Sequence, residues 1–312
     1  MDQLRPRWEV LADGPQATLF QSYSWNRLAA AHFGDREAPY VVLSENDNGV
    51  ALIPGSILSN GEISLLGEAL FDYRDTLSKG DPAVLLQAWR MLADFERPVS
   101  VMSLRGDPVR RRWAAFKPHE FCNAPGVALG RNSAESIEAN HRKLGRFSRR
   151  LERLGVVLRH HDGSDARLLR WIYEQKAKQF HGAGNNLFAD SRRIDFLIAA
   201  TLLAPSACDV FTYETTTEVI AALVTFRDRD TRRFYTIYFD QRWAKESPGQ
   251  VLVYKVTLQS LAEGLNCDYM TGEQSHKMRL ATLLVPLYRV QLSARELRKS
   301  LAEAQPAQGL VA

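Results

Sequence analysis

The sequence is poor in cysteine and contains no recognisable metal-binding motif. Cys122, Cys208 and Cys267 lie far apart in the chain and form neither a CxxC pair nor a disulfide framework. We therefore expect reduced thiols with structural roles. The seven histidines include no HxxxH or HExxH spacing, and the adjacent His160 and His161 would point to opposite faces of a strand. These absences argue against a metal site.

The chain also lacks long apolar runs and nucleophile motifs. No uncharged apolar stretch reaches the roughly 18 residues that a membrane span needs, and Asp2, Arg5, Arg7 and Glu9 stand where a signal peptide would have an apolar core. We therefore expect a cytoplasmic protein without a membrane span. The absence of a GxSxG motif and of a Cys–His signature argues against hydrolysis through a covalent intermediate.

Neither sign of charge dominates the sequence. The 40 Lys and Arg residues nearly balance the 36 Asp and Glu residues, and the net charge is +4. Positive charge is concentrated at residues 110–112 and 142–153. A nucleic-acid-binding protein would more often have a basic surface across the whole domain, so we expect a local anionic ligand and no nucleic acid. The sequence leaves the oligomeric state open.

Length and hydrophobic pattern predict two α/β modules, because 312 residues exceed the usual single domain of about 100–200 residues. We divide the chain into residues 1–125 and 126–312. In the first module the pattern predicts strands at 39–46, 49–59, 62–67, 71–77 and 99–106 and a helix at 82–95. In the second it predicts helices at 139–156, 166–180, 192–203 and from 247, and strands at 156–160, 208–215, 218–228, 232–240, 266–270 and 287–293.

The most informative stretch is 239–280, which joins an aromatic strand, a helix start and a charged turn. Ser247 is placed to cap that helix, and Pro248 suits its first position because a missing N–H costs nothing there. The next three residues would present free N–H groups to an anion such as phosphate, with roughly 0.3–1 kcal/mol of added attraction from the helix dipole. The Ser-Pro-Gly tripeptide can equally serve only to start a helix. The three residues are Gly249, Gln250 and Val251.

An internal repeat supports the division into two halves. Residues 81–106 align without gaps on 247–272, and the alignment matches a proline, two leucines and a glycine. Each copy reads as a helix started by proline, then a strand, then glycine. In the first copy Asp81 would repel a phosphate, so we expect the cofactor site in the second half.

The stretch 239–280 contains a set of residues that match a known family pattern, namely Asp240, Ser247-Pro248-Gly249, Gly264, Asp268-Tyr269, Gly272-Glu273 and Lys277. On these residues the second half resembles the CelD-type (cellulose-biosynthesis-type) acetyltransferase family of the GNAT superfamily, which is related to FemAB-like peptidyltransferases. The resemblance covers roughly residues 121–290, and the basic segment 139–156 is similar to the helix that precedes the family's main domain. Tyr269 stands where Phe is commoner, and His276 where Tyr often precedes the lysine.

The resemblance implies a GNAT-like mixed sheet flanked by helices, in two tandem GNAT-like halves. It also implies an acyl-CoA-dependent N-acyltransferase, with acetyl-CoA as the default donor, in which a small-molecule or saccharide amine attacks the thioester directly. Two alternatives remain. One is aminoacyl-tRNA-dependent transfer as in FemAB-like relatives, which the lack of a long inserted coiled-coil arm disfavours. The other is a non-catalytic protein that binds an anionic ligand on this fold.

Direct transfer needs a proton acceptor, a donor for the carbonyl oxygen and an anchor for phosphates. Asp240, Asp268 and Glu273 are candidate bases, although each could instead be a cap or a surface ion pair, and Lys277 could neutralise an anion. The N–H groups of strand 235–239 are candidates for polarising the carbonyl. The cofactor-binding candidates are Tyr238, Ser247, Gly249, Gln250 and Val251.

The basic helix at 139–156 is amphipathic. A solvated face packed against the core is its simplest interpretation, and binding of the acceptor or of a CoA phosphate is the alternative. Arg142 and Arg146 are therefore candidate substrate contacts, together with Phe180 and His181, which lie where two helices connect through 181–186. The apolar side of the helix is predicted to be Leu144, Phe147, Leu151 and Leu154, and the polar side to be Arg142, Arg146, Arg149, Arg150 and Arg153.

Overall fold

The computed structural model describes residues 1–15, 17–106, 112–182, 184 and 186–304. Its contacts divide the chain into two units, one of Met1–Cys122 with the residues from Pro286 onward, and one of Asn123–Val285. The chain therefore returns to its first unit at the end, whereas the sequence-based division counts those last residues with the second module. No helix formed by the described residues has the length and apolar character needed to cross a membrane.

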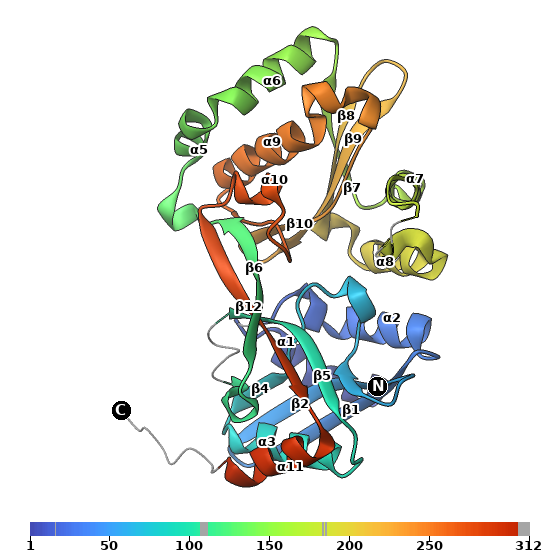
Figure 1. Ribbon diagram of the computed structural model, residues 1–312, viewed down its shortest axis with the longest axis vertical. Helices are drawn as coiled ribbons and strands as arrows, with labels where there is room; N and C mark the ends of the chain where they lie inside the picture. The colour runs from blue at the N-terminus through green and yellow to red at the C-terminus, as the bar shows by residue number, and fades with distance from the viewer. Residues whose placement is uncertain (16, 107–111, 183, 185, 305–312) are drawn as a thin grey trace. The chain divides into compact units, whose positions relative to one another are not determined.

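The first unit is a sheet with helices on both faces (Figure 1). Side chains alternate along its second strand, so Ala51 and Ile53 pack in one cluster with Trp89, while Leu52 packs in another with Trp8. The sheet order is β1-β2-β3-β5-β12, and β4 pairs with β2. The elements are α1 (Arg5–Ala12), α2 (Tyr23–Phe33), β1 (Glu37–Asn46), β2 (Gly49–Leu58), β3 (Ile63–Leu65), β4 (Leu77–Gly80), α3 (Ala83–Ala93), β5 (Val99–Arg105), β12 (Leu283–Leu292) and α11 (Ala294–Glu303).

The segment 71–77 does not form the predicted strand, because side chains take its backbone groups. Gln21 Nε2 donates to the Tyr73 carbonyl at 2.9 Å, and the Asp75 carboxylate accepts from Trp113 Nε1 at 2.9 Å and from the Thr76 N–H at 2.8 Å. These bonds satisfy buried polar groups without a strand ladder. Helices α1, α2 and α11 are found in addition to the predicted elements.

In the second unit, β7 to β10 form an antiparallel meander, β11 joins β10 in parallel, and β6 pairs antiparallel with β11. Helices α9, α5 and α6 cover one face of this sheet, and α7 and α8 cover the other (Figure 1). The elements are β6 (His119–Val127), α5 (Ala134–Asn140), α6 (Arg142–Arg153), β7 (Val157–Asp162), α7 (Ala166–Gln179), α8 (Ser191–Leu203), β8 (Cys208–Glu214), β9 (Val219–Asp228), β10 (Thr231–Phe239), α9 (Pro248–Ala262), β11 (Asn266–Asp268) and α10 (Ser275–Met278).

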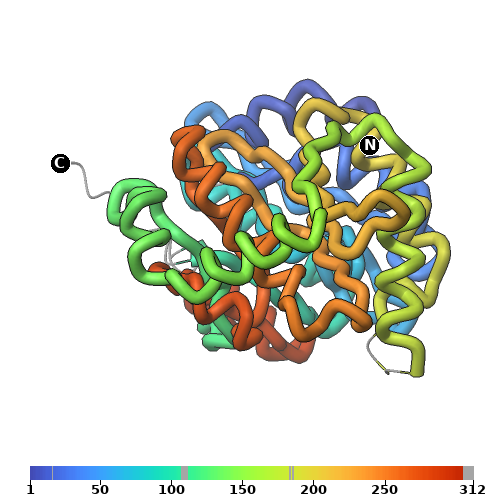
Figure 2. The backbone as a smooth tube through the Cα atoms, turned by 90° about the horizontal axis from the view of Figure 1, so that it is seen from above, coloured from blue at the N-terminus to red at the C-terminus, as the bar shows by residue number. Residues whose placement is uncertain are grey.

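The predicted basic helix is two helices, because α5 ends and α6 begins at His141, whose φ and ψ are −117° and 38°. Leu151 is fully buried, but Leu154 is 50% exposed instead of lying on the packed side. Leu154 follows the last residue of α6, so it no longer lies on the helix's apolar face. Helix α6 lies beside α9, as Figure 2 shows for the green and orange segments.

The repeat in the sequence corresponds to a repeat in the structure. In one copy α3 leads to β5 and then to Gly106, and in the other α9 leads to β11 and then to Gly272. Both glycines have positive φ, +76° and +101°, which favours glycine. The Asp81 carboxylate accepts a hydrogen bond from the Ala83 N–H at 2.9 Å, so it occupies the first turn of α3.

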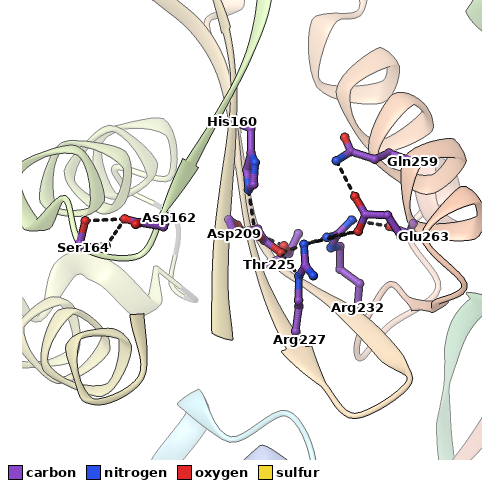
Figure 3. Close-up of polar contacts among 10 residues, drawn as sticks. His160, Asp162, Ser164, Asp209, Thr225, Arg227, Arg232, Gln259 and Glu263 are labelled. Atoms are coloured by element: carbon purple, nitrogen blue, oxygen red, sulfur yellow. Dashed lines mark hydrogen bonds and ion pairs between the residues drawn. The ribbon is translucent and has the colours of Figure 1, made fainter. Parts of the chain in front are cut away.

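A buried charge cluster joins the start of β10 to the end of α9 (Figure 3). Arg232 is fully buried, and its Nη2 lies 3.0 Å from Asp209 Oδ2 and 2.9 Å from Glu263 Oε2. Asp209 also accepts from Arg227 Nε at 2.6 Å and contacts His160 Nε2 at 2.7 Å. Burial alone would raise the pKa of Asp209, but these hydrogen bonds and the arginine charges outweigh it and lower that pKa.

We predict that Asp209→Asn lowers the free energy of unfolding by roughly 3 kcal/mol, because it leaves the buried Arg232 guanidinium with Glu263 as its remaining carboxylate. Asp195→Asn is the matched control in the same unit, since the Arg170–Asp195 pair is about half exposed and worth under about 1 kcal/mol. Urea unfolding measures both variants. Equal losses would contradict a structural role for the cluster.

Candidate functional site

The sheet of the second unit opens between β10 and β11. The two strands pair in parallel only from Thr231 to Arg233 with Asn266 to Asp268, whereas β10 continues to Phe239 along β9. A β-bulge at Tyr235 follows immediately after the paired stretch. Met270, with φ +65°, turns the other chain away. Backbone groups of β10 beyond Arg233 are therefore not paired with β11, and the sheet is open between the two strands from this point.

Asp268, one of the three candidate bases, lies at the end of the β10–β11 ladder, opposite Arg233. Its Oδ2 contacts Arg233 Nη1 at 2.5 Å, and its Oδ1 accepts from the Met270 N–H at 2.9 Å. Arg233 Nε also binds Asp228 Oδ2 at 2.7 Å, and all three charged side chains are under 10% exposed. Both oxygens of Asp268 are thus engaged in holding the turn after β11. This geometry supports a positioning role for Asp268.

The other predicted catalytic residues have separate partners. Asp240 accepts from the Arg242 N–H at 2.9 Å and forms an ion pair with that guanidinium, and the Arg242 hydrogen bond lowers the pKa of Asp240. Glu273 is exposed and accepts from Asn123 Nδ2 at 2.8 Å. Lys277 Nζ donates to the carbonyl of Thr271 at 2.8 Å. Asp240 therefore stabilises the helical turn after β10, as the alternative interpretation of a cap requires.

A cavity of about 360 Å³ lies where the α5–α6 junction, the start of α9 and α10 meet. Its volume falls within the range of small-molecule sites, about 300–1,000 Å³. Two of its lining side chains are cations, Lys143 and Arg279, and none of the described lining residues is acidic. The cavity therefore suits an anionic ligand. The lining residues are Asn140, His141, Lys143, Leu144, Phe147, Ser247, Gln250, His276, Arg279 and Leu280.

The start of α9 differs in detail from the prediction. Ser247 occupies the N-cap position, but its φ is +51° and its side chain makes no capping hydrogen bond. The Val251 N–H is not free, since it donates to the Ser247 carbonyl at 3.1 Å. A Cβ on Gly249 would lie 3.1 Å from Phe239 Cδ1. The side of Gly249 that lacks a side chain therefore packs against Phe239 and is not available for a ligand. Of the three residues predicted to present N–H groups, Gln250 lines the cavity.

Two ionisable residues near the opening have shifted pKa values. Burial lowers the pKa of His276, and the charges of Lys277, Lys176 and Arg279 lower it further, so the imidazole is neutral at neutral pH. Burial, followed by the charge of Lys277, lowers the pKa of Lys176 to about 8. The sequence alone does not indicate Lys176, because a lysine near the end of α7 looks like any solvated helix position. In the sequence His276 differs from its neighbours only as a departure from the CelD-type pattern.

The candidate substrate contacts lie at the edges of this region. Phe180 is 39% exposed, and Lys176 Nζ lies 4.6 Å from its ring, while His181 is exposed beside it. Arg142 and Arg146 are exposed on α6, but the cavity is lined by Lys143 of that helix. Residues 183 and 185 of the predicted connection, and 110–111 of the first basic segment, lie outside the described residues.

Tyr238, a candidate cofactor contact, is 9% exposed and meets the Trp171 ring edge-on at 5.4 Å. It therefore packs toward α7.

Burial raises the pKa values of Cys208 and Cys267 to about 12, which keeps these thiols protonated and unsuited to nucleophilic attack. Among the described residues, no group of three or more His, Cys, Asp or Glu side chains is placed to hold a metal ion.

Comparison with known proteins agrees with this architecture. Residues 139–278 match the family model for the acetyltransferase (GNAT) domain. The structure of FemX superposes with a TM-score of 0.61 at 8% identity, over 96% of this chain and 98% of FemX. The C-terminal domain of a putative lysylphosphatidylglycerol synthetase from Agrobacterium fabrum gives 0.60 at 11% identity, over 88% of this chain and 94% of that domain. No curated protein matches the sequence.

A tandem GNAT protein from the clavulanic acid biosynthesis pathway superposes with a TM-score of 0.50 at 12% identity, over 94% of this chain and 95% of that protein. The predicted fold class is confirmed: a GNAT-like mixed sheet flanked by helices, in two tandem GNAT-like halves. The matched residues 139–278 lie within the second unit of the chain. Residues 139–278 of this chain are thus similar to the acetyltransferase (GNAT) domain.

Proposed function

We propose that the protein is an acyl-CoA-dependent N-acyltransferase, with acetyl-CoA as the default donor and a small-molecule or saccharide amine as acceptor. The observation that carries the proposal is the cavity at the start of α9, which contains two cationic and no acidic described side chains and lies within the matched GNAT domain. Acyl-CoA supplies an activated acyl group as a thioester and carries phosphates that suit such a cavity. The CelD-type branch remains part of this proposal.

Different residues of the chain have separate roles in the proposed direct transfer. The Gln250 end of α9 and Arg279 hold phosphate in the cavity, and backbone N–H groups of β10 at 235–239 stabilise negative charge on the carbonyl oxygen. The amine nitrogen forms a bond to the acyl carbon, the carbon–sulfur bond breaks, and the sulfur leaves as a thiolate that takes up a proton. Neutral His276 accepts the proton that the amine loses, and Lys277 stabilises negative charge nearby.

The carboxylates take positioning roles in this proposal. Asp268 holds the turn after β11 through Arg233, Asp240 holds the turn before α9 through Arg242, and Glu273 is tied to Asn123. Removing the Asp268 charge would leave Arg233 with Asp228, so the turn and its direction would change. Turnover would then fall together with stability.

A second candidate is aminoacyl-tRNA-dependent transfer, which the exposed basic face of α6 favours. Among the described residues, one arginine of this helix, Arg150, forms an ion pair, with Glu246 at 2.8 Å. The other arginines of this face are exposed, and Lys143 of the same helix lines the cavity. Binding of charged tRNA at physiological salt, with no acetyl-CoA binding, would favour this candidate.

We predict that Gln250→Glu weakens acetyl-CoA binding at least about tenfold. The new carboxylate stands in the cavity and neutralises Arg279, whose Nη1 lies 3.2 Å from Gln250 Oε1. A glutamate in the first turn also favours the helix, so the variant should remain folded. Gly249→Asp is less informative, because its side chain would meet Phe239.

The control for that measurement is Gln87→Glu, the same change at an exposed position of α3, the corresponding helix of the first unit. Calorimetric titration with acetyl-CoA should show the wild-type affinity for this control. An unchanged affinity in Gln250→Glu would remove the cavity as the cofactor site. An equal loss in both variants would show a general charge effect.

We predict that His276→Gln lowers kcat/KM by roughly 10²–10⁴ while it retains acetyl-CoA affinity. The lowered pKa of His276 lies below the ordinary value of about 6.5, so wild-type kcat/KM should fall as the pH decreases below 6.5 and the imidazole takes up a proton. The variant should lack this acidic limb. The acceptor amine titrates at higher pH and affects both proteins alike, so the ratio of the two profiles isolates His276.

Asp268→Asn tests the positioning role of Asp268 against the proposed role of His276 as the base. As the partner of a buried arginine, its loss should lower the free energy of unfolding by roughly 3 kcal/mol, and the acidic limb of the pH profile should remain. Thermal melting and the pH profile measure the two effects. A stable Asp268→Asn variant that has lost its turnover would instead make Asp268 the base.

A further inference from the structure

Helix α6 presents a row of exposed arginines on its outer side. Four arginines at spacings of four, three and four residues lie within about 60° of one another around the helix axis, since successive residues are about 100° apart. Leu151, which is fully buried, lies on the opposite side of the helix. The four side chains therefore form one stripe that faces solvent. We call it the arginine stripe, and its residues are Arg142, Arg146, Arg149 and Arg153.

The protein does not neutralise the charge of the arginine stripe. Helix α6 contains six basic residues and one acidic residue, Glu152. Among the described residues none of the four stripe arginines forms an ion pair, whereas Arg150 beside them is paired with Glu246 at 2.8 Å. Glu152 accepts a hydrogen bond from Ser148 Oγ at 3.0 Å and lies to the side of the stripe. The stripe is thus a concentrated positive surface that is complementary to an anionic partner.

Two exposed aliphatic side chains follow the stripe directly. Leu154 is 50% exposed just after the last residue of α6, and Val157 is 52% exposed at the start of β7, an edge strand of the sheet. Within 142–159, all of which the structure describes, no aromatic side chain is exposed. A surface that binds single-stranded nucleic acid commonly offers aromatic side chains on which bases stack. Basic side chains next to exposed aliphatic ones instead suit the surface of an anionic bilayer.

We propose that the arginine stripe, together with Leu154 and Val157, binds the surface of a membrane that contains anionic phospholipids. The guanidinium groups bind the phosphates of the headgroups, and the two aliphatic side chains enter the boundary between headgroups and acyl chains. Helix α6 does not itself insert, because its apolar side is packed in the core of the second unit. Lys143 of the same helix lines the candidate cavity, so this binding brings the cavity close to the bilayer. The inference does not depend on the acyl donor.

Electrostatic attraction sets the size of the effect. An arginine near an anionic membrane surface contributes about 1 kcal/mol, which corresponds to about fivefold in affinity. Arg149→Gln combined with Arg153→Gln should therefore weaken binding roughly 30-fold. The charge-conserving pair Arg149→Lys and Arg153→Lys should retain most of the affinity, because the attraction depends mainly on charge. Leu154→Gln should weaken binding by a smaller factor that does not decrease as salt is raised, since salt screens charges and not apolar contacts.

Cosedimentation of the full chain with lipid vesicles measures these affinities. One set of vesicles contains phosphatidylcholine alone, and the other contains equal parts of phosphatidylcholine and phosphatidylglycerol. The wild type should bind the second set and not the first, and its binding should weaken as salt is raised. The matched control is Arg167→Gln combined with Lys178→Gln, which removes two exposed positive charges from α7, on the opposite face of the same sheet (Figure 1). This control should bind like the wild type.

The proposal is overturned if the wild type does not bind the phosphatidylglycerol vesicles, or if the α6 and α7 charge variants lose the same affinity, which would indicate a general charge effect. RNA binding that depends on Arg149 and Arg153, without vesicle binding, would make a nucleic acid the partner of the stripe instead. Thermal melting verifies that each variant is folded. Acetyl-CoA titration of the same proteins is a separate readout, so a failure of vesicle binding with intact acetyl-CoA binding would leave the proposed function standing.

Discussion

Two consecutive buried arginines at the start of β10 hold the structure on which the candidate site depends. Arg232 binds Asp209 and Glu263, which lie on β8 and just after α9, and Arg233 binds Asp228 and Asp268, which end β9 and β11. Adjacent strand residues point to opposite faces, so the two guanidinium groups tie β10 to its surroundings on both sides. Buried arginines require such partners, because an unpaired buried charge is costly.

The two arginines lie where β10 and β11 are paired, and the Arg233–Asp268 pair joins these two strands directly. On β10 the parallel ladder covers Thr231, Arg232 and Arg233, of which the two arginines carry the ion pairs, and it ends at Arg233. Beyond that point the bulge at Tyr235 and the left-handed turn at Met270 direct the two chains apart. The β10 backbone beyond Arg233 is therefore not paired with β11. Positioned backbone N–H groups are what the proposed transfer reaction requires.

In the second unit, acidic side chains paired with buried arginines lie apart from the cationic side chains that line the cavity. Acidic side chains such as Asp209, Asp228 and Asp268 pair with buried arginines, away from the cavity lining. The cavity at the start of α9 is lined by Lys143 and Arg279 without acidic residues. A nearly neutral sequence thus provides a locally positive site. The overall charge balance predicted a local anionic ligand but gave no position for it.

The sequence by itself determined the order of the elements from β7 to β11 and the place of the helix start. The pattern at 232–240 predicted β10, and the Ser-Pro-Gly tripeptide predicted the start of α9. At Gly264 the chain forms the expected glycine-terminated end, with the Leu265 N–H donating to the Ser260 carbonyl at 2.8 Å. These features depend on neighbouring residues, so a local pattern is sufficient to predict them.

Only the tertiary structure decided the roles of individual side chains. Asp268 has Arg233 as its partner, Gly249 packs on Phe239, and Lys143 lines the same cavity as Gln250 of α9. Each of these arrangements joins residues distant in the chain or on different elements. The shifted pKa values of His276 and Lys176 likewise depend on burial and on charges from α7 and α10 together. These contacts and pKa shifts depend on which elements pack against each other, and a local sequence pattern does not predict that packing.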